Sequence, residues 1–155
     1  MKKLSVTAFG LLLLFCLNKA SAQDRSIPLN EPDYNKPKLF ADLPQRMNLK
    51  TAGIESLFST ALGAPVSYRV ADNFLWEGTV VSRSDAADAT VKSIVIRSTN
   101  RPGATFTFTR KQQSDGTFSY IGRIMSRNNG DAFEIELDGS QYVLAKKNLY
   151  DLLSE

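Results

Sequence analysis

Two glutamates on one predicted strand are the residues of this sequence best placed to do chemistry. Glu134 and Glu136 alternate with Phe133, Ile135 and Leu137, so both carboxylates are expected on one face of a strand. Strand geometry separates them by about 7 Å, a spacing that the acid and base of an inverting glycosidase can use. A glycosidase acid needs a raised pKa, however, and an arginine on the neighbouring strand would lower it. We therefore interpret both acids as members of cross-strand charge pairs on an exposed sheet face.

The same stretch also suggests calcium binding, with oxygen ligands from Asp131, Glu134, Glu136 and Asp138. It has no EF-hand spacing, and successive residues of a strand point to opposite faces. The sequence has no His, and its only Cys is Cys16, in a segment that we expect to be removed. These absences exclude a Ser-His or Cys-His nucleophile and a metal site built on imidazole or thiolate. No glycine-rich phosphate loop occurs either, and we predict a protein that is not an enzyme and holds no metal or cofactor.

Charge is distributed unevenly along the chain. Residues 92–127 contain seven basic side chains and one acid, Asp115. The simpler interpretation, which we prefer, is that acidic and basic side chains of neighbouring strands neutralise one another across the hairpins. The alternative is a basic strip that binds an anionic partner, either a protein or a surface polymer. The residues that we expect at this surface, on the second face of the sheet, are Arg110, Arg123, Arg127, Met125 and Val143.

The first 22 residues have the organisation of a signal peptide. A positive start at Lys2 and Lys3 precedes the apolar stretch "LSVTAFGLLLLFCL", and Ala20-Ser21-Ala22 predicts cleavage before Gln23. The apolar stretch is too short for a comfortable membrane span. A lipoprotein beginning at Cys16 is the alternative, but a bulky phenylalanine precedes that cysteine. We expect an exported protein, periplasmic or extracellular.

Export would change the charge of the chain. Cleavage removes three of the 19 basic residues and no acid, which leaves 16 of each sign. A neutral domain has no overall field to attract nucleic acid, so we expect no nucleic-acid partner. No second apolar run reaches membrane length, and we do not expect an integral membrane protein.

Two elements are predicted before the sheet. Residues 23–48 contain four of the six prolines and predict an extended leader. We interpret this leader as a tether for a single domain at residues 49–155. Leu39, Phe40 and Leu43 are the side chains through which it could instead attach to that domain. Residues 50–62 predict an amphipathic helix, ended by Gly63 and Pro65. Its apolar stripe consists of Ile54, Leu57, Phe58, Ala61 and Leu62.

The remaining sequence predicts an α+β fold that is mostly β. Period-two alternation from Val66 to Ala145, interrupted by turn residues, indicates an antiparallel meander of about seven short strands. Such a sheet is expected to twist into a curled sheet or a small barrel, with a short C-terminal helix at "LYDLL". Either this tail or the helix at 50–62 is expected to cover the second face of the sheet. We expect the aromatic side chains at inward strand positions to form the core.

Turn chemistry predicts the strand registers. A three-residue turn at 114–116, with Gly116 left-handed, places Phe106 opposite Ile124 and Phe108 opposite Gly122. Type I′ turns at 129–130 and 138–139 place Arg123 opposite Glu136, and Ile135 opposite Tyr142. Both of these turns put Phe133, Ile135 and Leu137 on the buried face.

The segments "FLWEG", "SIVIRS", "YIGRIM" and "DAFEIELDGSQYVL", between residues 74 and 144, resemble the β-rich prodomain region of secreted bacterial zinc metallopeptidases. The chain lacks the zinc-binding helix motif of the peptidases themselves. The resemblance implies a free-standing inhibitor or folding partner of a protease. Two other functions follow from the residues alone, namely a non-catalytic domain that binds a protein or surface polymer, and a carrier of a small apolar ligand inside a curled sheet.

Overall fold

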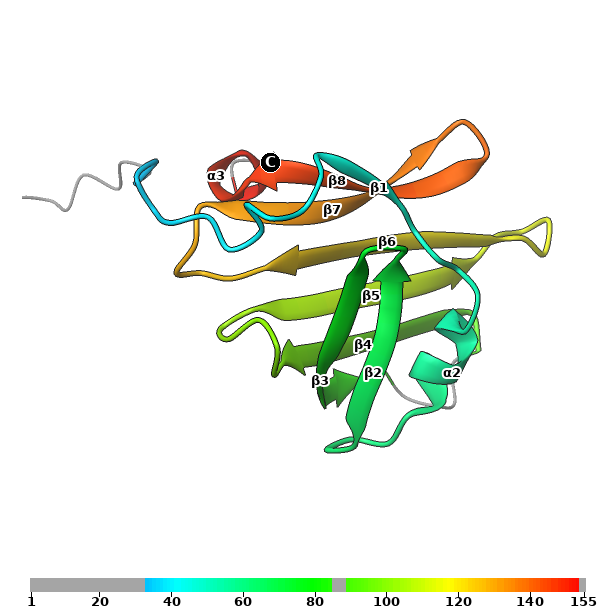
Figure 1. Ribbon diagram of the computed structural model, residues 1–155. Coiled ribbons are helices and arrows are strands. Elements are labelled where there is room, and N and C mark those ends of the chain that lie inside the picture. The colour runs from blue at the N-terminus through cyan, green and yellow to red at the C-terminus, as the bar shows by residue number, and fades with distance from the viewer. Residues whose placement is uncertain (1–32, 85–88, 154–155) are drawn as a thin grey trace, which may run out of the picture. The chain divides into compact units, whose positions relative to one another are not determined.

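The alternating segments of residues 65–83 and 91–148 form one antiparallel sheet in this computed structural model (Figure 1). The structure describes residues 33–84 and 89–153, so the predicted signal peptide and the start of the predicted leader lie outside the described residues. Within these ranges, eight strands follow the spatial order β1-β8-β7-β6-β5-β4-β3-β2. The elements are β1 (Arg46–Asn48), α2 (Ile54–Ser59), β2 (Pro65–Ala71), β3 (Phe74–Arg83), β4 (Val91–Ser98), β5 (Thr105–Gln112), β6 (Phe118–Met125), β7 (Asp131–Asp138), β8 (Gln141–Asn148) and α3 (Leu149–Leu153).

The predicted fold, a mostly β antiparallel meander with two short helices, is confirmed. Each strand from β2 to β7 pairs with the next strand in the sequence. The sheet curls into a half-barrel in which β1 and β2 remain the two edges. The eighth strand, β1, pairs with β8 and comes from the predicted leader.

The inner face of the curled sheet, which we define as the face that carries Phe106 and Phe108, holds the main core. Aromatic rings pack against one another there at ordinary contact distances. The centroids of Trp76 and Phe106 lie 5.8 Å apart, and those of Phe108 and Tyr120 lie 5.6 Å apart in a stacked arrangement. The interior is therefore filled with side chains, as expected for a small curled sheet.

The predicted register between β5 and β6 is confirmed. Phe106 lies opposite Ile124 and Phe108 opposite Gly122, and Gly116 has the left-handed φ of 84° that the three-residue turn requires. A side chain on Gly122 would meet the carbonyl oxygen of Thr107 at 2.6 Å, so only glycine fits at this point.

The predicted registers on either side of β7 are wrong by two residues. Arg123 lies opposite Glu134 instead of Glu136, and Ile135 lies opposite Leu144 instead of Tyr142. The two turns explain the shifts. Residue 130 lacks the positive φ that a type I′ turn demands, and the β7–β8 turn uses Gly139 (φ 62°) as its first central residue.

A shift of two residues preserves the faces of a strand, so Phe133 and Ile135 are buried as predicted. Leu137 is 61% exposed, and its predicted burial is wrong. It lies opposite Tyr142 close to the β7–β8 turn. The pairing of β6 with β7 reaches only to Arg123 and Glu134, so no part of β6 lies opposite Leu137 to cover it.

Residues 36–50, much of the predicted leader, form a strap that is part of the domain. Phe40 is fully buried in the core, and the buried carboxylate of Asp131 accepts hydrogen bonds from the backbone amides of Leu39 and Phe40 at 2.7 and 3.0 Å. The strap connects strands from opposite ends of the sheet order, because the Leu49 amide donates to β8 and the Lys50 amide to β2. The interpretation of this segment as a tether is wrong for residues 40–48, since buried apolar side chains and backbone pairing hold them in place.

The C-terminal helix α3 lies where it was predicted, at "LYDLL", whereas α2 is shorter than predicted. Helix α2 spans only Ile54–Ser59, and Leu62, predicted in its apolar stripe, is 64% exposed. Thr60 ends the helix with an extended backbone, three residues before Gly63. The ring of Phe58 stacks on Phe108, so α2 covers the inner face (Figure 1). None of the helices in the described ranges is long and apolar enough to cross a membrane.

Candidate functional site

The three arginines predicted to form one binding surface do not share a face. Arg110 follows Phe106 and Phe108 at even-numbered positions of β5, so its side chain lies on the inner face. It is only 7% exposed, forms an ion pair with Glu55 of α2, and has its guanidinium carbon 4.2 Å from the centroid of the Phe118 ring. Because α2 covers the inner face at this point, Arg110 is not available to a partner on the other face.

Val143 is also unavailable at the predicted surface. It is on the outer face of β8, but it lies between Asn48 of β1 and Glu136 of β7 and is 6% exposed. The strand that buries it on one side, β1, belongs to the segment that the sequence analysis assigned to the leader. Val143 therefore has a structural role in this part of the sheet.

Arg123, Met125 and Arg127 do come together on the outer face. Arg123 and Met125 occupy outward positions of β6, and Arg127 follows two residues later. Met125 packs on a small outer cluster that includes Leu152 of α3, so the predicted tail covers part of this face. Arg123 lies 2.9 Å from Glu134 on β7 and donates to the carbonyl oxygen of Leu152.

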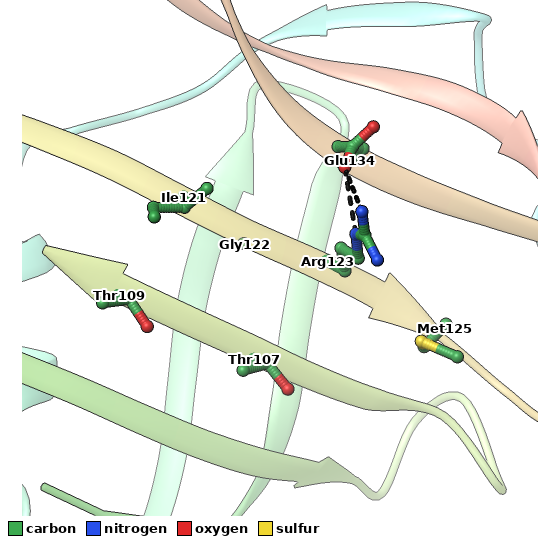
Figure 2. Close-up of a pocket in the computed structure, with 7 residues that line it drawn as sticks. All are labelled: Thr107, Thr109, Ile121, Gly122, Arg123, Met125 and Glu134. Atoms are coloured by element: carbon green, nitrogen blue, oxygen red, sulfur yellow. Dashed lines mark hydrogen bonds and ion pairs between the residues drawn. The ribbon is translucent and has the colours of Figure 1, made fainter. Parts of the chain in front are cut away.

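A shallow groove runs along β5 and β6 beside these residues. Its first part, of about 310 Å³, is lined by Thr107, Thr109, Ile121, Gly122, Arg123, Met125 and Glu134. Figure 2 shows the two threonines along β5, with Ile121, Arg123 and Met125 along β6 and Glu134 reaching Arg123 from β7. A second part, of about 460 Å³, is lined by Gly103, Thr105, Thr107, Met125, Arg127 and Asn128. The two parts share Thr107 and Met125 and therefore adjoin each other.

Cross-strand pairing aligns the outward residues of this face into rows. One row runs Ser82, Val95, Thr107 and Arg123, and another runs Thr79, Arg97, Thr105 and Met125. The outward positions of β4, β5 and β6 contain Arg97, Lys111 and Arg123 and no acid. In residues 33–84 and 89–153, neither Arg97 nor Lys111 nor Arg127 has an ion-pair partner. The groove is thus an electropositive strip with hydroxyl and apolar side chains.

The acids considered for catalysis are all occupied as partners of other groups. Glu136 is bonded to Lys147 and Arg46, and the Lys147 hydrogen bond, followed by the charges of both cations, lowers the pKa of its carboxyl group. Arg123, predicted to have this effect on Glu136, instead pairs with Glu134. Such a carboxylate is a poor general acid, since that role requires a raised pKa.

The four acids considered for calcium are also separated from one another. Asp131 is buried and bonded to strap amides, whereas Asp138 pairs with Arg46 at the other end of β7. Within the described part of the chain, no group of three or more acidic, His or Cys side chains is arranged to hold a metal ion.

Sequence reasoning missed the threonine wall of the groove. Thr105, Thr107 and Thr109 were assigned to the exposed face by the alternation of "TFTFT", but they were not considered as candidate site residues. Ile121 was missed too, although it stands between Tyr120 and Gly122 at an outward position and is 58% exposed. An apolar side chain at an outward position was the signal that could have identified it.

Comparison with protein-family models, curated proteins and solved structures finds no match to this chain. The resemblance to metallopeptidase prodomains therefore stays a prediction, and the groove itself is the basis for any assignment of function.

Proposed function

We propose that this protein is an exported, non-catalytic binding domain that recognises a partner macromolecule through the groove on the outer face of β5 and β6. The observation that carries the proposal is the exposure of Ile121 in a groove that ends at Arg127 and is followed along β5 by Lys111, two cations without acidic partners in the described ranges. An exposed apolar side chain framed by arginine is a common composition at protein interfaces. Export rests on the predicted signal peptide at residues 1–22.

The arrangement of charges favours binding over catalysis. The carboxylates near the groove are engaged by cations: Glu134 by Arg123, and Glu136 by Lys147. The Lys147 hydrogen bond lowers the pKa of Glu136, whereas proton transfer needs a group with a pKa near the working pH. The inner face gives the alternative of an apolar-ligand carrier little support, because aromatic rings pack through it. A prodomain-like inhibitor would be one form of the binding function proposed here.

The test is capture of partners from the envelope and medium of the producing cell. Immobilised wild-type protein is compared with an Ile121→Asp/Arg127→Glu variant, which places negative charge in the groove without touching the inner face. A Leu62→Asp/Arg69→Glu variant makes matched changes at exposed positions away from β5 and β6. Thermal unfolding establishes that both variants fold.

We expect the groove variant to lose the partner that wild type and the matched control retain, as judged by mass spectrometry of the captured material. Retention of the same partner by all three proteins would refute this face as the recognition surface. Loss of the partner by both variants would point to a general effect of charge, and would equally count against the groove.

A further inference from the structure

The groove has the length and shape of a site for an extended chain. It follows the strand direction from Thr109 and Ile121 at one end to Gly103 and Arg127 at the other. Along β5, Thr105 and Thr109 are four residues apart, about 13 Å at roughly 3.3 Å per residue, and the groove continues beyond the strand to Gly103 and Arg127. A partner segment of about six residues in extended conformation would fill it.

The side chains along the groove indicate the chemistry of that segment. Ile121 offers apolar contact at one end, whereas Met125 is partly covered by α3. Within the described ranges, the hydroxyl groups of Thr105 and Thr107 have no hydrogen-bond partner, so they are available to polar groups of a bound chain. A peptide provides both kinds of group, with side chains for Ile121 and backbone amides and carbonyls for the threonines.

The positive side chains along the groove indicate the charge expected of the partner segment. Arg127 lines the groove, Arg97 lies directly opposite Thr105, and Lys111 lies two residues beyond Thr109 on the same strand. Arg123 is already neutralised by Glu134. The three cations that have no ion pair in the described part of the chain favour acidic side chains at both ends of a bound segment.

The alternative anionic partner, an acidic polysaccharide, is less well matched. Sugar rings stack on exposed aromatic faces, and the outward positions of β4, β5 and β6 carry no aromatic residue. Those positions carry an exposed isoleucine instead, and sugar hydroxyl groups that covered it would lose hydrogen bonds to water that an apolar side chain cannot replace.

Resting on the proposed function, we propose that the groove binds an extended acidic segment of a partner protein, with an apolar side chain of the segment on Ile121 and carboxylates on Arg97, Lys111 and Arg127. The probe is a fluorescently labelled octapeptide with two Asp residues at each end and four Leu residues between them, so that either face of the extended chain presents both apolar and acidic side chains. Its two comparison peptides carry Asn or Lys in place of every Asp, and an oligogalacturonate of similar length tests the polysaccharide.

We expect the Leu/Asp peptide to bind about tenfold more tightly than the Leu/Asn peptide, with an affinity that falls as salt rises. The Arg97→Ala/Arg127→Ala variant should lose about tenfold in affinity, and Ile121→Asp should lose at least as much. An Arg69→Ala/Lys38→Ala variant removes the same charge at exposed positions outside β4, β5 and β6, and it should bind like wild type.

Equal binding of the Asp and Asn peptides, or tighter binding of oligogalacturonate than of the Leu/Asp peptide, would overturn the acidic-peptide assignment. Failure of this inference is distinguishable from failure of the proposed function. In the first case the groove variant still loses its natural partner in the capture experiment, and in the second case it retains that partner.

Discussion

The inner and outer faces of β5 differ although they are built from the same six residues. In "TFTFTR" the residues at even positions, Phe106, Phe108 and Arg110, are all buried. Phe106 packs on Trp76 of β3, whereas Phe108 and Arg110 contact side chains of α2. The threonines at odd positions border an open groove that has Arg123 and Met125 on its far side. A period of two residues thus separates the part of the sequence that stabilises the fold from the part available for recognition. The two sets of residues should therefore be separable by mutation.

The two faces also use charge differently. On the inner side, the Asp131 carboxylate and the Lys146 ammonium group are bonded to backbone atoms of the strap, which fixes an irregular segment in place. On the outer side, Arg97 and Arg127 have no acidic partner among the residues that the structure describes. Charges of the first kind are expected to contribute to stability and charges of the second kind to binding.

The largest effect on stability is expected from removing an aromatic ring on the inner face. Phe106→Ala should lower the free energy of unfolding by about 3–5 kcal/mol, because the ring is 1% exposed and its removal leaves a cavity beside Trp76. Thr107→Ala, the next residue on the outer face, should change it by less than about 0.5 kcal/mol. Urea unfolding followed by tryptophan fluorescence measures both. Similar losses in the two variants would show that the faces are assigned incorrectly.

A smaller loss of stability is expected when the attachment of the strap is removed. Asp131→Ala removes the acceptor of two backbone amides, Leu39 N and Phe40 N, and should cost about 2–4 kcal/mol because buried donors are left unsatisfied. Asp138→Ala is the matched control on the same strand, since its side chain is 62% exposed and its ion-pair partner is Arg46 at the surface. It should cost less than about 1 kcal/mol. Hydrogen exchange should also show faster exchange of the strap amides in Asp131→Ala alone, and unchanged exchange would contradict the proposed attachment.

The smallest effect on stability is expected from the Asp42–Arg101 ion pair, and it should depend on pH. The hydrogen bond from Arg101 lowers the pKa of Asp42 below its ordinary value of 3.8 in the folded protein. A depressed carboxyl pKa contributes stability above the unfolded value, and this stability is lost as the pH falls through the folded value. Because the Asp42 side chain is 58% exposed, Asp42→Asn should cost no more than about 1 kcal/mol at pH 6.

As the pH falls below 3.8 and through the lowered pKa of Asp42, the Asp42→Asn variant and wild type should converge in stability, since protonated Asp42 no longer pairs with Arg101. Thermal unfolding between pH 2.5 and 7 measures this difference. A difference that persists undiminished at the acid end would mean that Asp42 stabilises the strap by a route other than its charge.

Local sequence patterns were sufficient where one short segment decides the geometry. The three-residue turn at 114–116 fixed the β5–β6 register, because Gly116 is the residue that can adopt the left-handed backbone there. The alternation of each strand likewise assigned most inner and outer residues correctly, including Phe133 and Ile135. Both features depend on residues that are neighbours in the chain, so no knowledge of distant contacts was needed.

Tertiary structure decided everything that depends on segments far apart in the sequence. The Pro-rich segment became a strap because Asp131, some 90 residues later, accepts its amides, and Arg110 became inaccessible because Glu55 of α2 pairs with it. Leu137 was left exposed where the pairing of β6 with β7 ends. The groove exists only because β5 and β6 place Thr107 and Thr109 beside Ile121 and Met125. Alternation assigns a residue to a face, but the elements that later cover that face determine whether the residue is core, structural pair or free surface.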